Sequence, residues 1–359
     1  MPRFTIGPLF LFTVPAILSA QQPSERYTID ADAVAIYNLV GTVRVEPGEG
    51  DVTVQVARGG ADAAQLRIAQ GEIAGRGTLR VVYPGGRIRA GTKGHDDSSS
   101  LRVRDDGTFG DSDSEWGGHG RHRDWEEGRK VTISDQDGLD ARADLVVRVP
   151  RGRRAAIYLA VGAVTAANID GELRIDTHAA GVTANGVKGE LIIDVGSGSV
   201  RVTQVQGDLS VDTGSGSVEV STVRGTSLSI DTGSGDVTGT DLDAGELNVD
   251  TGSGEIRLSG ITSPKLSLET GSGRITAELR RDVSSLEAET GSGDIAISAP
   301  ASLGAEVQIE TSSGDIETDF PLQVTHHGQD QLVGTIGDGK GTIEIQTGSG
   351  GIKLLKGST

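Results

Sequence analysis

The sequence predicts an all-β protein: a right-handed parallel β-solenoid of about ten coils, each of roughly 18–21 residues, continuing from an N-terminal β-strand region. Three observations predict this fold. A short motif recurs at near-constant spacing, apolar residues alternate on both sides of it, and the composition suits a thin core repeated many times. A unit of two short strands cannot bury its own apolar face, so successive copies must stack on one another.

The recurring motif is an acidic or amide residue followed by Thr-Gly-Ser-Gly or a close variant. Its copies begin at Asp194, Asp212, Asp231, Asp250, Glu269, Glu289, Glu310 and Gln346, after two degenerate copies around Tyr158 and Asp176. The starts are evenly spaced as far as Glu310, at roughly one coil length, and the last copy follows after nearly twice that interval. Such regularity is the signature of a repeat architecture.

Each copy reads as two short strands around a glycine corner. Around "SVDTGSGSVEV" every second residue is apolar or β-branched, which indicates strands with one buried face. Glycine tolerates positive backbone φ angles, so Gly214 and Gly216 permit a tight bend. We expect Thr213 to end the inward row and to form a ladder with its equivalents, while Asp212 points outward.

The composition agrees with a narrow core and excludes several partners. Aromatic residues make up 3% of the chain, glycine contributes 54 residues and cysteine is absent, so Val, Ile, Leu and Ala must fill the interior. The formal charge of −18 argues against nucleic acid and against anionic lipid as partners, because both are polyanionic.

The N-terminus predicts export. Residues 1–20 combine an early Arg, an apolar run and small residues at Ser19 and Ala20, which is the pattern of a secretory signal peptide cleaved after Ala20. No later segment is apolar enough to span a bilayer, so we expect no transmembrane segment in the mature chain. The expected location is the periplasm, the cell surface or the medium.

The remaining division follows composition. Residues 21–90 predict an N-terminal β-strand region, residues 91–130 a flexible polar and acidic loop, and residues 131–359 the β-solenoid repeat region. Histidines occur in the loop, near the C-terminus and, at His178, in a degenerate corner where we expect an exposed side chain; none forms a preformed metal pattern. They are His95, His119, His122, His178, His326 and His327.

The order of these segments resembles a known family. The carrying stretches are "NLVGTVRVEPGEGDVTVQV", "VVRVPRG", the "VDTGSGSV" coils, and "TDFPL" followed by "GTIGDGKGTIEIQTGSGGIKLLKG". Over residues 27–357 the chain resembles the bacterial family of β-strand-repeat adhesin-like proteins, a domain family of unknown function. The resemblance implies a signal peptide, a β-repeat fold and an envelope or secreted location, and it supplies no catalytic or binding residues.

The letters Asp-Thr-Gly also occur in aspartic proteases, but the spacing excludes that activity. A protease dyad needs two carboxylates that share one proton, each from a separate lobe. Here the motif recurs in every coil, and its acid becomes amide at Gln346. We therefore expect no catalytic residues and no enzyme activity.

The acids that begin the motif should stack at one strand spacing. At ~4.8 Å, each neighbouring pair repels by about 1 kcal/mol in water and by several at an effective dielectric constant near 20. Compensation would come from splayed side chains, from raised pKa values, from basic neighbours such as Arg201, Arg257 and Arg274, or from bound cations. Weak candidate calcium ligands are Asp236, Asp241 and Asp243. A solvated acidic face without metal is the favoured interpretation.

The sequence thus predicts an exported, non-enzymatic scaffold that binds an unidentified envelope or cell-surface component, and it specifies no cofactor and no oligomeric state. The first alternative is an envelope protein that binds Ca²⁺ along the stacked acids. A remote alternative is a polysaccharide-active β-helix protein, which would need a carboxylate cluster in a groove.

Overall fold

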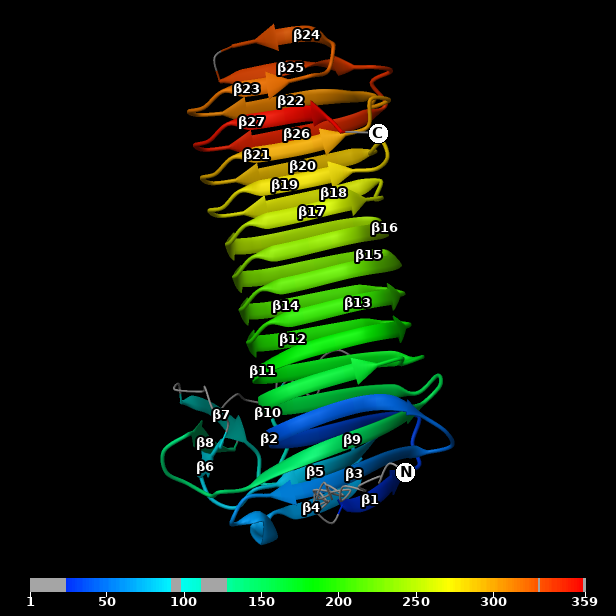
Figure 1. Cartoon of the computed structure of the whole chain (residues 1–359), viewed down its shortest axis with the longest axis vertical. Helices are drawn as coiled ribbons and strands as arrows, with labels where there is room; N and C mark the ends of the chain where they lie inside the picture. The colour runs from blue at the N-terminus through cyan, green and yellow to red at the C-terminus, as the bar shows by residue number, and fades with distance from the viewer. Residues whose placement is uncertain (1–23, 92–97, 111–127, 329, 358–359) are drawn as a thin grey trace, which may run out of the picture.

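The computed structural model describes residues 24–91, 98–110, 128–328 and 330–357, so the predicted signal peptide, residues 1–20, lies outside it. Within these ranges the chain is all-β apart from one 3₁₀ turn, η1 (Ala63–Gln65). A 24-stranded sheet forms a tall column, and a three-stranded sheet lies beside its N-terminal end (Figure 1). No helix in the described ranges is long and apolar enough to cross a membrane.

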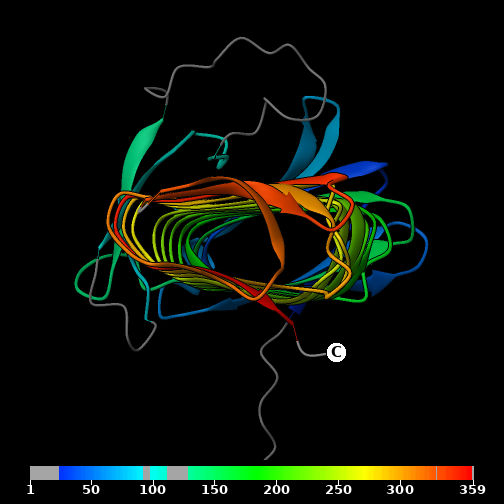
Figure 2. The same cartoon turned by 90° about the horizontal axis from the view of Figure 1, so that it is seen from above.

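The column consists of parallel strands that stack in strict register. Its central strands are β10 (Arg154–Ala167), β11 (Glu172–Lys188), β12 (Leu191–Ser197), β13 (Val200–Gln206), β14 (Leu209–Ser215), β15 (Val218–Ser234), β16 (Val237–Ser253), β17 (Ile256–Ile261), β18 (Lys265–Thr270), β19 (Ile275–Leu279), β20 (Ser285–Thr290) and β21 (Ile295–Ala299). Each coil contributes a strand to each of two faces, and the coils superpose in a flattened outline (Figure 2).

Apolar rows fill the space between the two faces. One row runs through Leu191, Leu209, Leu228 and Leu247, which pair directly in register and are almost fully buried. Every side chain in such a row contacts its equivalents above and below, so alternation along the strand becomes a continuous core. The all-β, solenoid-like repeat is therefore confirmed, whereas the right hand and the number of coils stay predictions.

The stack begins earlier than the sequence motif indicates. The strand β2 (Ala33–Gly48) pairs in parallel with β10 along almost its whole length, so it forms a coil of the same kind. The halves of β2 pair on the other side with β5 (Arg76–Val82) and β9 (Arg142–Pro150). Antiparallel strands complete this end: β1 (Ser24–Ile29), β3 (Val52–Gly59) and β4 (Arg67–Ile73).

Part of the segment predicted as a flexible loop is built into the small sheet. This sheet contains β6 (Arg87–Arg89), β7 (Ser99–Val103) and β8 (Arg129–Ser134), and β7 falls inside residues 91–130. Val103 and Phe109 are buried, which anchors this stretch. Residues 92–97 and 111–127, with His95, His119 and His122, lie outside the described residues. The four-part division of the chain stays a prediction.

The C-terminal strands do not follow sequence order. They are β22 (Ala305–Thr311), β23 (Ile316–Thr318), β24 (Leu322–His327), β25 (Gln331–Ile336), β26 (Gly341–Thr347) and β27 (Ile352–Lys356). β26 pairs in parallel with β20 on one side and with β22 on the other. Likewise, β27 lies between β21 and β23. The last coil is therefore inserted between the two that precede it.

This insertion overturns the expectation that Glu310 stacks directly on Glu289. Gln346 lies between them and pairs with both in register. The physical reason is the antiparallel hairpin of β24 and β25, which occupies the outer edge of β22 and turns the chain back. The returning strand then fills the position that remains between β20 and β22.

Candidate functional site

A column of stacked acids, with the neutral Gln346 near its C-terminal end, runs along one face of the solenoid, as the motif predicts. Its in-register members are Asp176, Asp194, Asp212, Asp231, Asp250, Glu269 and Glu289, followed by Gln346 and then Glu310. Asp176, Asp194 and Glu310 are partly buried, and the other members are exposed to solvent. Because Gln346 is neutral, it separates the last two glutamates and removes one of the repulsive contacts that sequence order would impose.

The acids affect one another's ionisation. Partial burial, and then the charges of Asp194 and Asp231, raise the pKa of Asp212. Burial and the charge of Asp231 raise the pKa of Asp250. For Glu269 the charge of Asp250 is the largest cause of the raised pKa. Repulsion along the column is therefore relieved in part by holding protons more tightly.

The arginines expected to neutralise the column bind other acids instead. Arg201 Nη2 lies 2.6 Å from Glu219 Oε2, and Arg274 Nη2 lies 3.5 Å from Asp294 Oδ2. Arg257 pairs with Glu255. All three arginines follow the glycine corner and so lie on the opposite face from the column. Their predicted role is wrong.

The corner itself is held by backbone packing. Gly216 has a φ of +139°, and a Cβ there would lie 2.2 Å from the carbonyl oxygen of Gly198 in the coil below. The predicted inward threonine ladder is confirmed, since Thr213 and Thr251 are buried. The hydroxyl of Thr251 donates to the carbonyl oxygen of Gly235 at 3.3 Å. The motif that resembles a protease loop is therefore a structural corner.

The three candidate calcium ligands are not brought together. Asp241 lies between two arginines, with Oδ2 2.9 Å from Arg224 Nη2 and Oδ1 2.7 Å from Arg280 Nη1. These hydrogen bonds lower the pKa of Asp241. Asp243 reaches the same Arg224 at 3.7 Å. Asp236 lies elsewhere and accepts a hydrogen bond from the backbone amide of Glu255.

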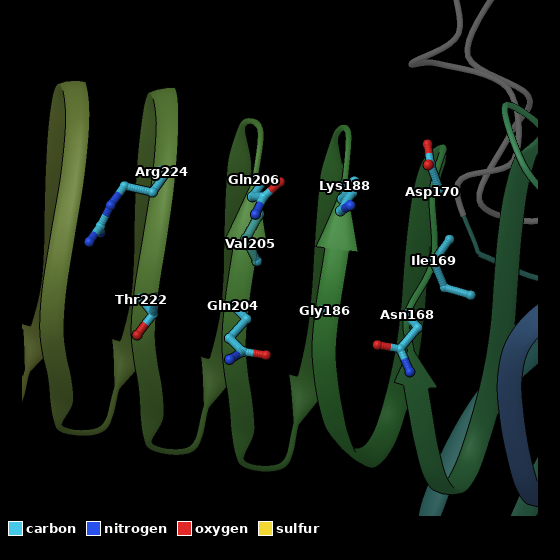
Figure 3. Close-up of a pocket in the computed structure, with 10 residues that line it drawn as sticks. All are labelled: Asn168, Ile169, Asp170, Gly186, Lys188, Gln204, Val205, Gln206, Thr222 and Arg224. Carbon is cyan, nitrogen blue, oxygen red and sulfur yellow. The ribbon is translucent and has the colours of Figure 1, made fainter.

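A second bend of each coil carries residues in the left-handed backbone region. Their φ angles lie between 55° and 71°, and they recur at one position per coil: Asn168, Gly186, Gln204, Thr222, Asp241 and Gly260. Over the first four of these coils the bend forms a shallow groove of about 460 Å³ (Figure 3). This column was not predicted from the sequence; its one regular feature there is a polar residue or glycine before a buried aliphatic residue in every coil.

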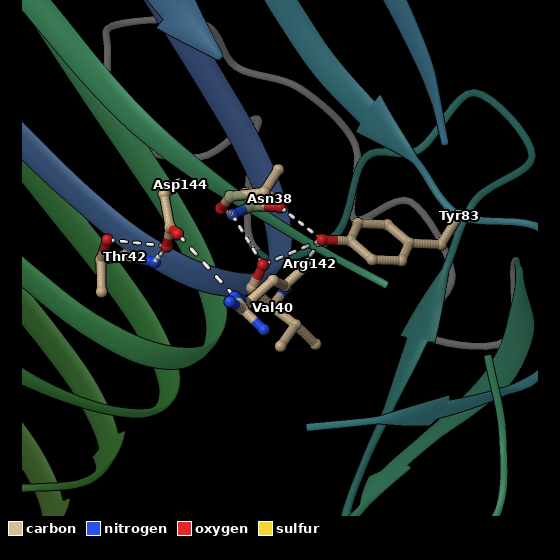
Figure 4. Close-up of polar contacts among 7 residues, drawn as sticks. Asn38, Val40, Thr42, Tyr83, Arg142 and Asp144 are labelled. Atoms are coloured by element: carbon tan, nitrogen blue, oxygen red, sulfur yellow. Dashed lines mark hydrogen bonds and ion pairs between the residues drawn. The ribbon is translucent and has the colours of Figure 1, made fainter. Parts of the chain in front are cut away.

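A buried polar cluster closes the corner of the first coil (Figure 4). The hydroxyl of Tyr83 donates to Asn38 Oδ1 at 2.9 Å or to the carbonyl oxygen of Val40 at 2.9 Å. Asn38 Nδ2 in turn donates to the carbonyl oxygen of Ala143 at 2.7 Å. Burial is the main reason that the pKa of Tyr83 is raised far above its ordinary value. A neutral, enclosed tyrosine of this kind pins two segments together and cannot reach a substrate.

Aromatic residues take the place of acids at the first two rungs of the column. Tyr37 and Tyr158 pair in register and stack with ring centroids 4.4 Å apart. Phe109 packs edge-on against Tyr37 at 5.9 Å. The segment that follows β7 thus covers the N-terminal start of the column through Phe109, and the exposed acids begin beyond it.

The described residues offer little for nucleophilic or metal chemistry. His178 is exposed on β11, as expected, and His326 and His327 are exposed on β24. In the ranges that the structure describes, no group of three or more His, Cys, Asp or Glu side chains is arranged to hold a metal ion. What the surface presents is an acidic face and a polar groove.

Comparison with known proteins found one matching family model. The model of the Toastrack DUF4097 family matches residues 118–355. Among solved structures, the chain is similar to a putative cell adhesion protein from Clostridium sporogenes ATCC 15579, with 12% identity and a TM-score of 0.22. That match covers 93% of this chain and 99% of the other. No curated protein matches the chain.

Proposed function

The chain belongs to the Toastrack DUF4097 family, and from that premise we propose that it is an exported, non-enzymatic scaffold that makes adhesive or interaction contacts at the bacterial cell envelope. The family match covers the repeat region and agrees with the β-repeat resemblance of the sequence. The observation that carries the proposal is the surface: regular columns of outward side chains in register over many coils, such as Asp212, Asp231 and Asp250. A flat periodic surface suits contact with an extended or repeated partner.

The handedness of the solenoid, the number of its coils and the segment boundaries belong to the same proposal. A right-handed solenoid of about ten coils is the arrangement that parallel strands joined by short corners favour, because parallel crossovers are overwhelmingly right-handed. The regular register between β11 and β20 supports it. The segment boundaries at residues 20, 90 and 130 are part of the proposal too.

Export rests on the N-terminal sequence. Residues 1–20 have the order of a cleavable signal, and we propose that the mature chain begins at Gln21. Cell fractionation of a C-terminally tagged chain, followed by N-terminal sequencing, tests this. A cytosolic chain that retains residues 1–20 would contradict export.

The interaction proposal is tested by capture from the envelope. The mature chain, immobilised through its C-terminus, is incubated with washed envelope fractions. The matched variant replaces residues 111–127 with a short Gly-Ser linker, which leaves β7 and Phe109 in place. Retention by both chains locates the contacts on the solenoid, loss in the variant locates them in residues 111–127, and retention by neither contradicts the proposal.

Calcium binding along the acidic column is the second candidate. The raised pKa values of Asp212, Asp250 and Glu269 favour it, because a cation would relieve the same repulsion that raises them. Calorimetry and thermal melting in millimolar Ca²⁺ are the test. Neither heat nor a shift in Tm would remove this candidate.

The remote alternative is activity on polysaccharides. Its support is limited to the general shape that β-helix proteins share. Incubation with envelope polysaccharides and measurement of new reducing ends would reveal such activity, and we expect none.

A further inference from the structure

The C-terminal coil separates two coils that are able to stack directly on each other. We call β26 and β27 the terminal coil, β20 and β21 the inner coil, and β22 and β23 the outer coil. The terminal coil lies between the other two on both faces of the solenoid (Figure 1). The hairpin of β24 and β25 lies beyond the outer coil, on the far edge of β22.

The inner and outer coils share one register. Each residue of the terminal coil that pairs on both sides shows which inner and outer residues would meet if the terminal coil were absent. These pairs are apolar or identical: Leu286 with Val307, Thr290 with Thr311, and Ile295 with Ile316. Direct stacking would therefore continue the apolar rows and the threonine ladder without any shift along the strands.

The glycine corner also permits direct stacking. A Cβ on Gly350 of the terminal coil would lie 2.1 Å from the carbonyl oxygen of Gly293 in the inner coil. A Cβ on Gly314 of the outer coil would lie 2.0 Å from the carbonyl oxygen of Gly350. Because each of these three positions is glycine, Gly314 is able to occupy the place of Gly350 above Gly293.

The segment that leads from the inner coil to the outer coil has the length of an ordinary connector. Residues 300–304 join β21 to β22 and climb two rungs, past the terminal coil. Residues 280–284 join β19 to β20 and climb one rung. Both connectors contain five residues. Five residues are thus enough for a single step, and the length of residues 300–304 does not hold the two coils apart.

The residues that close the end of the core have an equivalent partner one rung lower. Asp319 donates its backbone N–H to the carbonyl oxygen of Leu354 at 3.2 Å. Ile297 of the inner coil pairs with Leu354 in register, so its carbonyl oxygen points in the same direction along the stack. Direct stacking would replace the Leu354 acceptor with the Ile297 acceptor.

Insertion is favoured in the intact chain because the terminal coil satisfies two strand edges at once. The hydroxyl of Thr347 donates to the carbonyl oxygen of Gly293 at 3.0 Å, and Lys353 Nζ lies 2.7 Å from Glu317 Oε2. Since β25 already occupies the far edge of β22, insertion is the arrangement that lets β26 pair on both sides. The buried side chains of the terminal coil add apolar contacts; they are Ile343, Ile345, Ile352 and Leu354.

We propose that the terminal coil is a removable spacer. While it fills the gap, Gln346 separates Glu289 from Glu310; when it leaves, the outer coil closes onto the inner coil in the same register and carries the hairpin of β24 and β25 with it. Residues 337–340, which join β25 to β26, are the hinge. Closure makes Glu289 and Glu310 direct neighbours, so the spacer determines whether the acidic column is interrupted at this end.

The test uses the full mature chain and expels the terminal coil by substitution. Ile343→Asp with Ile345→Asp places two carboxylates at buried positions of β26, which strongly disfavours insertion. Thr342→Asp with Glu344→Asp is the matched control, because these two positions on the same strand are exposed. Ile352→Asp, at a buried position of β27, is a second and independent way to expel the coil.

Engineered cysteines report closure, since the natural chain contains none. Glu289→Cys with Glu310→Cys comes within disulfide reach only when the gap closes, because Cα atoms two rungs apart are about 10 Å from each other. Glu287→Cys with Glu310→Cys is diagonal in the closed arrangement, at about 8 Å, and so stays out of reach. A disordered outer coil, by contrast, would cross-link both pairs.

Under mild oxidation we expect the Glu289–Glu310 cysteine pair to cross-link in both expelled-coil backgrounds and to stay reduced in the control. The diagonal pair should stay reduced in every background. Cross-linking of both pairs in the expelled-coil backgrounds would show an outer coil without fixed register and would overturn the proposal. Cross-linking of neither pair in these backgrounds would show that the gap does not close, and would overturn it as well.

Discussion

Replacing Gly235 with Ala tests the stacked corner, on which every column of the solenoid depends. Gly235 has a φ of +150°, and an added Cβ would lie 2.2 Å from the carbonyl oxygen and 2.6 Å from the carbonyl carbon of Gly216. Both atoms belong to the backbone of the neighbouring coil, so relief requires the two rungs to separate. No side-chain rearrangement can absorb this clash.

The expected loss is large for a single methyl group. Overpacking in a rigid core costs about 1–3 kcal/mol, and a strained φ adds about 1–2 kcal/mol, so Gly235→Ala should lower the free energy of unfolding by roughly 2–5 kcal/mol. Gly181→Ala is the matched control, because the atom nearest to its added Cβ is the carbonyl oxygen of Ser199, at an ordinary 3.6 Å. We expect the control to change stability by less than about 0.5 kcal/mol.

Chemical denaturation followed by circular dichroism measures the global effect. Hydrogen exchange of the amides in β15 and β16 measures the local effect, because a repeat stack can open at one interface. The reasoning would be refuted if Gly235→Ala and Gly181→Ala had the same denaturation midpoint and the same exchange rates.

Three further predictions follow from the column, the buried tyrosine and the arginine pair. The pKa values of Asp212, Asp250 and Glu269 are raised in the folded chain, so the folded chain binds more protons than the unfolded chain, and these groups make stability fall as pH rises from the unfolded pKa through the folded pKa. The triple variant Asp212→Asn, Asp250→Asn, Glu269→Gln should therefore melt at least about 2 °C higher than the wild type at pH 7 and lose that pH dependence. A lower Tm would contradict this prediction. Tyr83→Phe should cost about 1–3 kcal/mol by denaturation, because it leaves Asn38 Oδ1 unpaired in the core, and a neutral result would show that the cluster is not structural. Asp241→Asn keeps a side chain that tolerates positive φ but removes the negative charge that faces Arg224 and Arg280, so the free energy of unfolding should fall by less than about 1 kcal/mol. This difference should vanish in high salt. Because the pKa of Asp241 is lowered in the folded chain, the wild type should also lose this stabilisation as pH falls through that pKa.

The sequence was sufficient to predict the repeat because the geometry of the corner restricts which residue types can occupy it. A position such as Gly216, where a Cβ would meet backbone at 2.2 Å, admits only glycine, and the alternation on either side reports which face is buried. The inward threonines and outward acids followed from the same pattern. Periodicity carries this information because each coil meets the same neighbours.

The sequence did not predict two parts of the fold, the early coil formed by β2 and the inserted position of β26. β2 has no Thr-Gly-Ser-Gly corner, and its likeness to β10 lies in "AIYNLVG" against "AIYLAVG", where Asn38 and Tyr83 replace the usual packing. The inserted strand β26 has an ordinary motif, so only the unusually long interval before Gln346 marked it. Local patterns specify what a coil is and do not specify the order in which coils stack.

The groove at the second bend (Figure 3) could not be predicted because its backbone conformation is unusual for its residues. Nothing in Gln204 or Thr222 signals a left-handed backbone, and only the register with Gly186 and Gly260 reveals it. The arginine assignments failed because spacing from the acids along the chain did not show which face each side chain occupies. Arg257, for example, binds Glu255 beyond the corner.

Engineered disulfides test the order of stacking most directly, since the natural chain has no cysteine. A disulfide needs Cα atoms within about 7 Å, which holds for neighbouring rungs and fails for rungs two spacings apart. The account predicts that Glu289→Cys with Gln346→Cys cross-links under mild oxidation, and that Glu289→Cys with Glu310→Cys does not. Cross-linking of the second pair and not of the first would contradict the inserted coil and the column built upon it.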